Sequence, residues 1–205
     1  MYTPTHFRFD DAAAPLAFMR QYSFATLVTA PAGEAPFATH LPFTVEERPA
    51  GIFLLAHLAR ANPQWHHFAD GEALVIFQEP HAYISPRWYD KELSVPTWNY
   101  TAVHAYGPAR LIEREDAVFE ILEKLIGQSE PAYFEHWNRL PPDYKSAMAK
   151  GIAAFEIAVQ RLEGKEKLSQ NRAEKEVDKI MGGLENSPLP SDRALADLMR
   201  RKYKR

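Results

Sequence analysis

Residues 95–107 read VPTWNYTAVHAYG, a stretch in which aromatic or imidazole side chains stand at positions 98, 100, 104 and 106. Successive side chains of a β-strand point to opposite faces of a sheet. One face therefore carries aromatic and hydrogen-bonding groups: Trp98, Tyr100, His104 and Tyr106. The other carries smaller or β-branched side chains: Val95, Thr97, Asn99, Thr101 and Val103. The alternation predicts a strand whose aromatic face either packs in a core or lies against a flat aromatic ligand.

Five further runs have the composition of strands and are bounded by turn-forming residues. They cover residues 24–30, 36–46, 52–59, 73–86 and 154–164, and the opening stretch continues through residues 109–113. The first three follow one another across short turns, so we expect an antiparallel meander. Pro42 lies inside the second run and has no N–H to donate to a neighbouring strand. This predicts an edge strand or a bulge at Pro42, with backbone groups free to meet a ligand.

Helical spacing and capping residues predict helices around this sheet. They are expected behind Asp10 or Asp11, at 63–68 behind Asn62, at 114–130, from about 173 to 181 with an end at Gly182-Gly183, and after Ser191. The fold class is therefore mainly β with helices (α+β), with six or so antiparallel strands. We expect one domain over residues 1–165 and a helical extension over 166–205 that packs on or near a cofactor cleft. Its last residues have the composition of a basic, solvated tail.

Composition narrows the functional classes. The chain has 205 residues, a formal net charge of −3 and no cysteine, which excludes disulfides, thiolate catalysis and iron–sulfur clusters. It has no G-x-G-x-x-G or P-loop motif, and no paired histidine and carboxylate spacing that predicts a metal site. No run approaches the roughly 20 apolar residues of a membrane span, and the first residues lack a signal-peptide layout. We therefore expect a cytoplasmic protein that contacts no membrane.

The segment HLARANPQW, residues 57–65, has the residue types of a phosphate site. Arg60 is a permanent cation whose planar fork matches phosphate oxygens. Asn62 and Pro63 begin a helix whose first N–H groups are free donors. An ordinary surface arginine beside a helix cap is an equally good interpretation of the spacing alone.

Two further polar segments are weaker candidates. In FATHLPFTVE, residues 37–46, His40 and the break at Pro42 fit either a ligand-facing strand or an ordinary edge strand. KEKLSQNR, residues 165–172, is rich in hydrogen-bond donors, although a polar loop leading into a helix is the simpler interpretation. Taken alone, neither segment identifies a ligand.

Five separated motifs together resemble the PaiB-like family of FMN-binding negative transcriptional regulators: HLPF, HLARANPQW, VIFQEPHAYISPRWY, VPTWNYTAVHAYG and KLSQN. The resemblance implies the FMN-binding split β-barrel fold and a homodimer with flavin between its subunits. By position in the motifs, it implies that the ring system lies against Thr39, His40, Leu41 and Pro42. It implies that the phosphate lies near His57, Arg60 and Asn62. The remaining implied cofactor residues are Trp98, Lys167, Ser169, Gln170 and Asn171.

The resemblance leaves the activity open. A regulator that responds to flavin is the first interpretation, with DNA contact through the basic tail as a weakly supported possibility because the chain is acidic. A small FMN-dependent oxidoreductase, similar to the pyridoxamine 5′-phosphate oxidases, is the alternative. Haem binding is a remote third, with ligands among His40, His57 and His104. The catalytic residues are unknown in each case.

Overall fold

The computed structural model describes residues 1–9, 11 and 13–203. These residues cluster into two compact units, each built from separated segments of the chain. Unit 1 contains residues 1–15, 78–103 and 163–205, and unit 2 contains residues 16–77 and 104–162. The domain expected over 1–165 therefore contributes to both units, and the helical extension belongs to unit 1.

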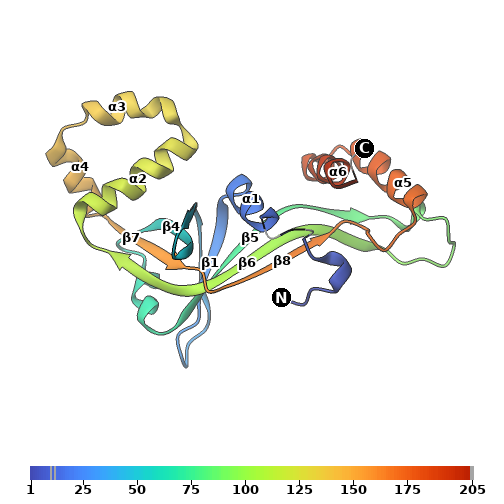
Figure 1. Cartoon of the computed structure of the whole chain (residues 1–205), viewed down its shortest axis with the longest axis horizontal. Helices are drawn as coiled ribbons and strands as arrows, with labels where there is room; N and C mark the ends of the chain where they lie inside the picture. The colour runs from blue at the N-terminus through green and yellow to red at the C-terminus, as the bar shows by residue number, and fades with distance from the viewer. Residues whose placement is uncertain (10, 12, 204–205) are drawn as a thin grey trace. The chain divides into compact units, whose positions relative to one another are not determined.

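The described residues form eight strands: β1 Phe24–Thr29, β2 Phe37–Pro42, β3 Thr44–Arg48, β4 Gly51–Ala59, β5 Glu72–Ile84, β6 Thr97–Ile112, β7 Ile152–Ala158 and β8 Arg161–Lys167. Strand β1 pairs antiparallel with β2 and β5, and β4 pairs antiparallel with β3 and β7. Their order is β2-β1-β5-β6-β7-β4-β3, and β8 pairs with β6 (Figure 1). The expected α+β class is confirmed. The expected three-strand meander is wrong, because β2 and β3 lie at opposite ends of this order. Two local hairpins form instead, β1 with β2 and β3 with β4.

Two runs that were predicted as single strands are each divided. The run 36–46 breaks after Pro42, where Phe43 turns into the core and its N–H donates to the Ser23 carbonyl. The run 154–164 breaks at residues 159–160, where Gln160 N–H donates to the Tyr106 carbonyl. At the first break the chain exchanges β1 for β4 as its partner, and at the second it leaves β4 and continues beside β6. Alternation of side chains does not reveal such changes of partner.

The core of unit 2 is built on aromatic packing. Phe43 lies between Phe77 and Phe155, with ring centroids 5.9 and 6.1 Å away, and all three are fully buried. Gly107 in β6 allows the next strand to approach, because a Cβ there would lie 2.0 Å from the Ala158 carbonyl oxygen. A side chain at this position therefore cannot be accommodated without moving β7.

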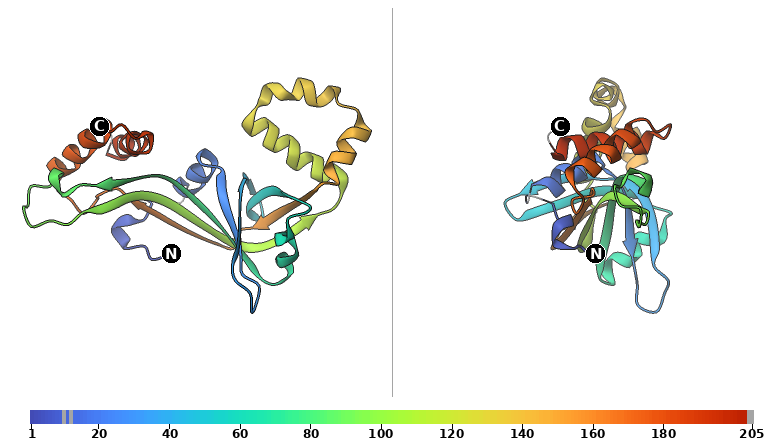
Figure 2. Two further views of the ribbon diagram at one scale, coloured as in Figure 1. Left: turned by 180° about the vertical axis from the view of Figure 1, so that it is seen from behind. Right: turned by 90° about the vertical axis from the view of Figure 1, so that its right-hand side faces the viewer.

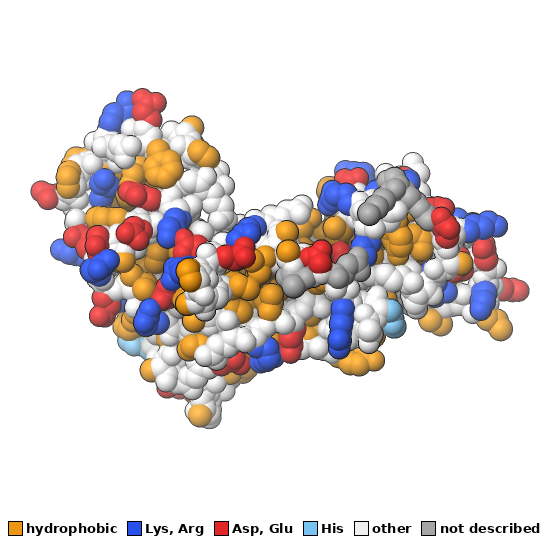
Figure 3. Space-filling model, viewed as in Figure 1, with side chains coloured by type: hydrophobic (Ala, Val, Ile, Leu, Met, Phe, Trp, Pro, Cys, Tyr) orange, Lys and Arg blue, Asp and Glu red, His pale blue; other side chains and the backbone are white. Residues whose placement is uncertain are grey.

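Helices complete unit 2. The elements are α1 Ala14–Gln21, which begins in unit 1, and η2 Pro63–Ala69, α2 Glu115–Ser129, η4 Pro131–Tyr133, α3 Phe134–Arg139 and α4 Pro142–Ala149. The predicted helices at 63–68 and 114–130 are thus confirmed. Between β6 and β7 the chain makes a helical excursion through α2, α3 and α4 (Figure 1), over which acidic and basic side chains are mixed (Figure 3). The apolar stripe of α2, with Val118, Ile121 and Leu125, packs against Leu55 of β4.

The first helix has the cap that its sequence predicted. Asp11 accepts hydrogen bonds at Oδ1 from the N–H groups of Ala13 and Ala14, at 2.8 and 2.7 Å. Asp10, the other cap considered, lies outside the described residues. Leu16 and Met19 of α1 are buried, as expected for a docked amphipathic helix.

Unit 1 packs two long helices on the strand segments that it contains. The helices are α5 Glu174–Glu185 and α6 Pro190–Tyr203, preceded by the short elements η1 Thr5–Phe7 and η3 Pro86–Trp88. In both views of Figure 2 the two helices lie side by side on one face of the strands. Leu195, Ala196 and Met199 of α6 are fully buried in a shared core. The expectation of a solvated tail is therefore wrong over residues 190–203.

Helix α5 also differs from its prediction. It continues through Gly182-Gly183 to Glu185 instead of ending at the glycine pair. Gly183 permits a close contact inside the helix, since a Cβ there would lie 2.3 Å from the Trp88 indole. Glycine at this position therefore allows close approach and does not end the helix. Within the described residues, no helix is both long and apolar enough to cross a bilayer.

The Gly107→Ala variant tests the strand contact. We expect it to lower the free energy of unfolding by about 3 kcal/mol, because the new methyl group overpacks the Ala158 carbonyl. The control is Gly127→Ala in α2, where the new methyl group meets the Phe134 ring at an ordinary 3.4 Å. We expect it to raise stability by about 0.5 kcal/mol through helix propensity. Denaturant unfolding of both variants checks the prediction, which equal losses would contradict.

Candidate functional site

Strand β2 is the edge strand that Pro42 predicted. It pairs with β1, with Leu27 opposite Thr39 and Thr26 opposite His40, and it ends the strand order of the described sheet. Its outer edge therefore presents backbone N–H and C=O groups that no described strand satisfies. Such an edge can bind the polar rim of a flat ligand.

The side chains of β2 alternate between the core and the surface. Leu41 is buried, while His40 and Pro42 are exposed. The Nδ1 of His40 lies 2.9 Å from the Thr26 hydroxyl, which fixes the imidazole against β1. Of the four residues expected at the ring system, Leu41 is thus a core residue whose contribution to a ligand would come from its backbone.

Asn62 joins the strand to the segment that follows β4. Its Nδ2 donates to the Thr39 hydroxyl at 2.9 Å, and its Oδ1 accepts from the Gln64 N–H at 3.0 Å. The expected cap is therefore present, although η2 is a 3-10 helix of seven residues and the cap uses one of its free donors. The structure brings together two residues that the motifs placed in separate parts of the site, Thr39 and Asn62.

Arg60 lies just before this junction with an exposed guanidinium. The group lies 5.3 Å from the centre of the Trp65 ring, and the Trp65 indole N–H donates to the Arg60 carbonyl at 3.0 Å. Among the described residues it forms no ion pair with a carboxylate, although Glu113 and Glu115 line the same cavity of about 300 Å³. Arg60 is therefore an exposed cation beside Trp65 of η2, without a carboxylate partner among the described residues, and it can bind an anion.

His57 belongs to a different surface. It faces helix α2 and lines a separate cavity of about 280 Å³ with apolar and aromatic side chains that include Leu122, Leu125 and Trp137. Its Nδ1 is buried without a hydrogen-bond partner in the described structure, and burial lowers the pKa of this imidazole. The structure does not place His57 in the cavity that Arg60 lines.

Gln64 was not expected to take part in the site. It is fully buried, and its Nε2 donates to the carbonyls of Leu27 at 3.2 Å and Phe37 at 3.1 Å. Its amide also lies 3.3 Å from the Thr29 hydroxyl. Gln64 therefore fastens η2 to β1 and β2. The sequence held one indication of this role: Gln64 is an uncharged side chain in the first turn of a helix, where an exposed position often has an acidic residue.

The later candidates belong to unit 1. Ser169 is 3% exposed and holds a left-handed backbone, with φ of 66°, through a hydrogen bond from Asn99 Nδ2 to its Oγ at 2.9 Å. Gln170 accepts from the Leu168 N–H, so its side chain closes the same turn. Ser169 and Gln170 are thus committed to internal hydrogen bonds, while Asn171 is exposed.

Lys167 is half-buried and Trp98 is exposed. Burial, together with the ammonium of Lys165, lowers the pKa of Lys167, whose Nζ contacts the Thr97 hydroxyl. Trp98 is 53% exposed, with its ring 6.0 Å from that of Tyr83. These two residues could meet a ligand without rearrangement of the fold.

The donor set of unit 2 suits a phosphorylated planar ligand. Arg60 supplies a cation for the phosphate, and the open edge of β2 supplies backbone groups for a heteroaromatic rim. The fold agrees with solved flavoproteins. The chain matches the flavocytochrome Anf3 from Azotobacter vinelandii with a TM-score of 0.63 at 18% identity, over 77% of this chain and 67% of that one. It matches the FAD and haem binding protein of Mycobacterium smegmatis with a TM-score of 0.63 at 16% identity, over 83% and 78%.

These features define the class: the protein is a flavin-binding split β-barrel, as the motifs implied. The chain belongs to the family described as the putative FMN-binding domain, which matches residues 1–161. It is 38% identical to the protease synthase and sporulation protein PAI 2 of Bacillus subtilis (strain 168) over 209 residues, covering 100% of this chain and 99% of that protein. The cofactor is FMN.

The Gln64→Leu variant tests the junction. Without the amide, the Leu27 and Phe37 carbonyls lose a buried donor, so we expect a loss of about 2 kcal/mol or more in unfolding free energy. The matched change at the exposed Gln21 of α1 should alter stability by less than about 0.5 kcal/mol. Equal effects in thermal unfolding would show that the junction contributes nothing.

The His57 cavity predicts a pH dependence. Since burial lowers the pKa of His57 below its usual 6.5, the unfolded chain binds a proton that the folded chain excludes as pH falls below that value. The unfolding free energy is therefore unaffected by this residue above about pH 7 and falls as the pH is lowered from there towards the folded-state pKa. Denaturant unfolding between pH 7 and 5 should show that the unfolding free energy of His57→Gln changes less with pH than that of the native chain. Parallel slopes would contradict the assignment.

Proposed function

We propose that FMN lies along the outer edge of β2, with its phosphate at Arg60 and Asn62. The observation that carries the proposal is the hydrogen bond from Asn62 Nδ2 to Thr39, which fixes the residues after β4 against the middle of this open edge. Thr39, His40 and the backbone of Leu41 and Pro42 would orient the ring system. FMN supplies the electron-transfer chemistry when bound, and the protein supplies binding and orientation.

The protein would act as a homodimer. Strand β2 exposes Phe37 and Pro42, and the neighbouring β1 exposes Phe24, so apolar surface gathers beside the proposed flavin site. Surface of this kind is typical of faces that another protein covers. We propose that a second copy of the chain covers this apolar surface, with the flavin bound between the two copies.

The proposed activity is regulation that responds to flavin and does not depend on the C-terminal helix as a DNA-binding element. Two basic side chains of α6 are already paired, because Arg200 donates to both carboxylate oxygens of Glu185 and Lys202 pairs with Glu166. Acidic and basic groups are mixed over these helices on the face shown in Figure 3. A helix with paired cations offers few charges for phosphate neutralisation.

An FMN-dependent oxidoreductase is the second candidate. The ion pairs of Arg200 and Lys202 favour it, because an oxidoreductase needs no free cations for DNA. The two candidates differ in simple assays of the purified protein. NADH or NADPH that bleaches bound flavin favours the oxidoreductase. A flavin-dependent, salt-sensitive shift of promoter DNA favours the regulator and shows that a surface other than α6 contacts the DNA.

Flavin titration of Arg60→Ala tests the phosphate assignment. Loss of a charge-assisted hydrogen bond should weaken FMN binding about 10- to 100-fold, measured by quenching of flavin fluorescence. Riboflavin, which lacks the phosphate, should bind the variant and the native chain equally. The control is Arg139→Ala in the exposed part of α3, which should leave both affinities unchanged. An equal loss for riboflavin, or no loss for FMN, would place the phosphate elsewhere.

A further inference from the structure

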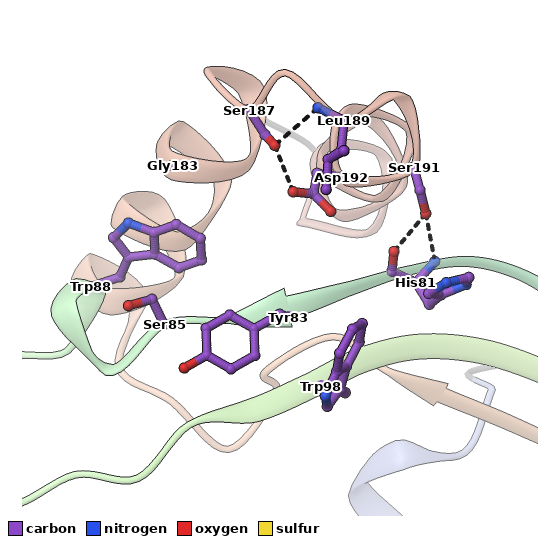
Figure 4. Close-up of a pocket in the computed structure, with 10 residues that line it drawn as sticks. All are labelled: His81, Tyr83, Ser85, Trp88, Trp98, Gly183, Ser187, Leu189, Ser191 and Asp192. Carbon is purple, nitrogen blue, oxygen red and sulfur yellow. Dashed lines mark hydrogen bonds between the residues drawn. The ribbon is translucent and has the colours of Figure 1, made fainter.

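Unit 1 contains a cavity of about 450 Å³ beneath helices α5 and α6. Its floor is formed by β5 and β6, and its roof by the ends of the two helices that face each other (Figure 4). The residues that line it are His81, Tyr83, Ser85, Trp88, Trp98, Gly183, Ser187, Leu189, Ser191 and Asp192. This volume is that of a small-molecule site. None of the roof residues is part of the proposed flavin site.

Aromatic rings form the floor and one wall. Tyr83 and Trp98 stand on neighbouring strands, with ring centroids 6.0 Å apart and planes at 76° (Figure 4). They are 46% and 53% exposed, which leaves much of their ring surface open to the cavity and solvent. His81 continues the floor, 6.1 Å from the Trp98 ring. Large rings with exposed faces are costly to leave uncovered, so this arrangement points to a ligand.

The third ring, that of Trp88, is held in position by the helix above it. The indole lies so close to the backbone of α5 that a Cβ on Gly183 would approach it to 2.3 Å. Helix α5 thus has a glycine where the Trp88 indole approaches its backbone, and Trp88 also packs against the buried cluster of unit 1. This packing restricts the indole, which lowers the entropic cost of binding a ligand against it.

The roof carries one carboxylate. Ser187 donates its hydroxyl to Asp192 Oδ2 at 2.6 Å, which orients the group, while Oδ1 has no hydrogen bond within the described residues (Figure 4). Ser191 is occupied, since its hydroxyl donates to the His81 carbonyl at 2.6 Å and so ties α6 to β5. No Lys or Arg side chain belongs to the described lining, and the guanidinium of Arg193 is bonded to the Ser187 carbonyl.

Three aromatic rings and one oriented carboxylate are the groups that recognise an organic cation. Ring faces attract ammonium groups through their quadrupole, most strongly for Trp, and a carboxylate adds direct charge complementarity. An anion would meet Asp192 without a compensating Lys or Arg in the described lining, and a neutral aromatic ligand would leave that carboxylate unused. We propose that this cavity binds a small organic ammonium ion, with its cationic head between the rings and Asp192.

Choline and its neutral isostere 3,3-dimethylbutan-1-ol distinguish charge from shape. We expect choline to bind saturably to the full chain, with a heat of binding and a change in tryptophan fluorescence, and the neutral isostere to bind at least about tenfold more weakly. Tetramethylammonium should compete with choline. Equal affinity for the isostere would show that the cavity selects shape alone and would overturn the proposal, as would the absence of saturable binding by both cations.

Two variants locate the bound cation. Asp192→Asn keeps an acceptor for Ser187 but removes the charge, and Trp88→Leu removes one ring; each should weaken choline binding about tenfold. Asp197→Asn, an exposed carboxylate on the same helix, is the matched control and should change nothing. Choline affinity that survives in both variants would place the cation elsewhere and overturn the assignment.

The flavin assay separates folding from recognition. Asp192→Asn should retain the native FMN affinity and thermal unfolding while its affinity for choline falls. If all three quantities decline together in Asp192→Asn, Gly183→Ala provides the second test, because its methyl group should displace Trp88 without altering any charge. Unchanged choline affinity in Gly183→Ala would overturn the role assigned to the Trp88 wall.

Discussion

The hydrogen bonds of two neighbouring amides, Asn62 and Gln64, are the constraint on which the candidate flavin site depends. Gln64 is buried and donates to carbonyls of β1 and β2, while Asn62 caps η2 and donates to Thr39. Together they convert two strands and a connecting segment into one junction. Arg60 lies two residues before Asn62 on the chain, so its backbone is joined directly to this junction. A charged side chain at position 64 could not replace the amide without burying an unpaired charge.

Local features of unit 2 could be predicted because they rest on local chemistry. The break at Pro42, the cap at Asn62 and the amphipathic helix α2 follow from a missing N–H, a side-chain acceptor and an apolar stripe. The strand order could not be predicted, because pairing of β4 with β7 joins residues about a hundred positions apart. Side-chain alternation states which face of a strand is buried but not which strand lies beside it. The same limit explains His57, whose strand position was expected but whose neighbour, α2, was not.

The aromatic face of the opening stretch has a different role in each unit. In unit 1, Trp98 faces Tyr83 and His81, and Tyr100 lies beneath the ammonium of Lys165. In unit 2, Tyr106 stacks with the guanidinium of Arg161 at 3.4 Å. On the opposite face Asn99, Thr101 and Val103 are each fully buried, while Val95 precedes the start of β6 and is exposed. Alternation thus predicted the two faces, while the cations that cover the rings come from residues 161–165, which only the folded chain brings alongside.

Residues 165–203 show why dense polar sequence is a poor guide to exposure. KLSQN has the composition of a ligand loop, yet Ser169 and Gln170 close a turn and Tyr203 donates to the Leu168 carbonyl. Helix α6 has the composition of a basic tail, yet its apolar stripe is buried and two of its cations pair with glutamates. The C-terminal segment is therefore an integral part of unit 1, because the Arg200–Glu185 pair joins α6 to α5 and the Lys202–Glu166 pair joins α6 to β8.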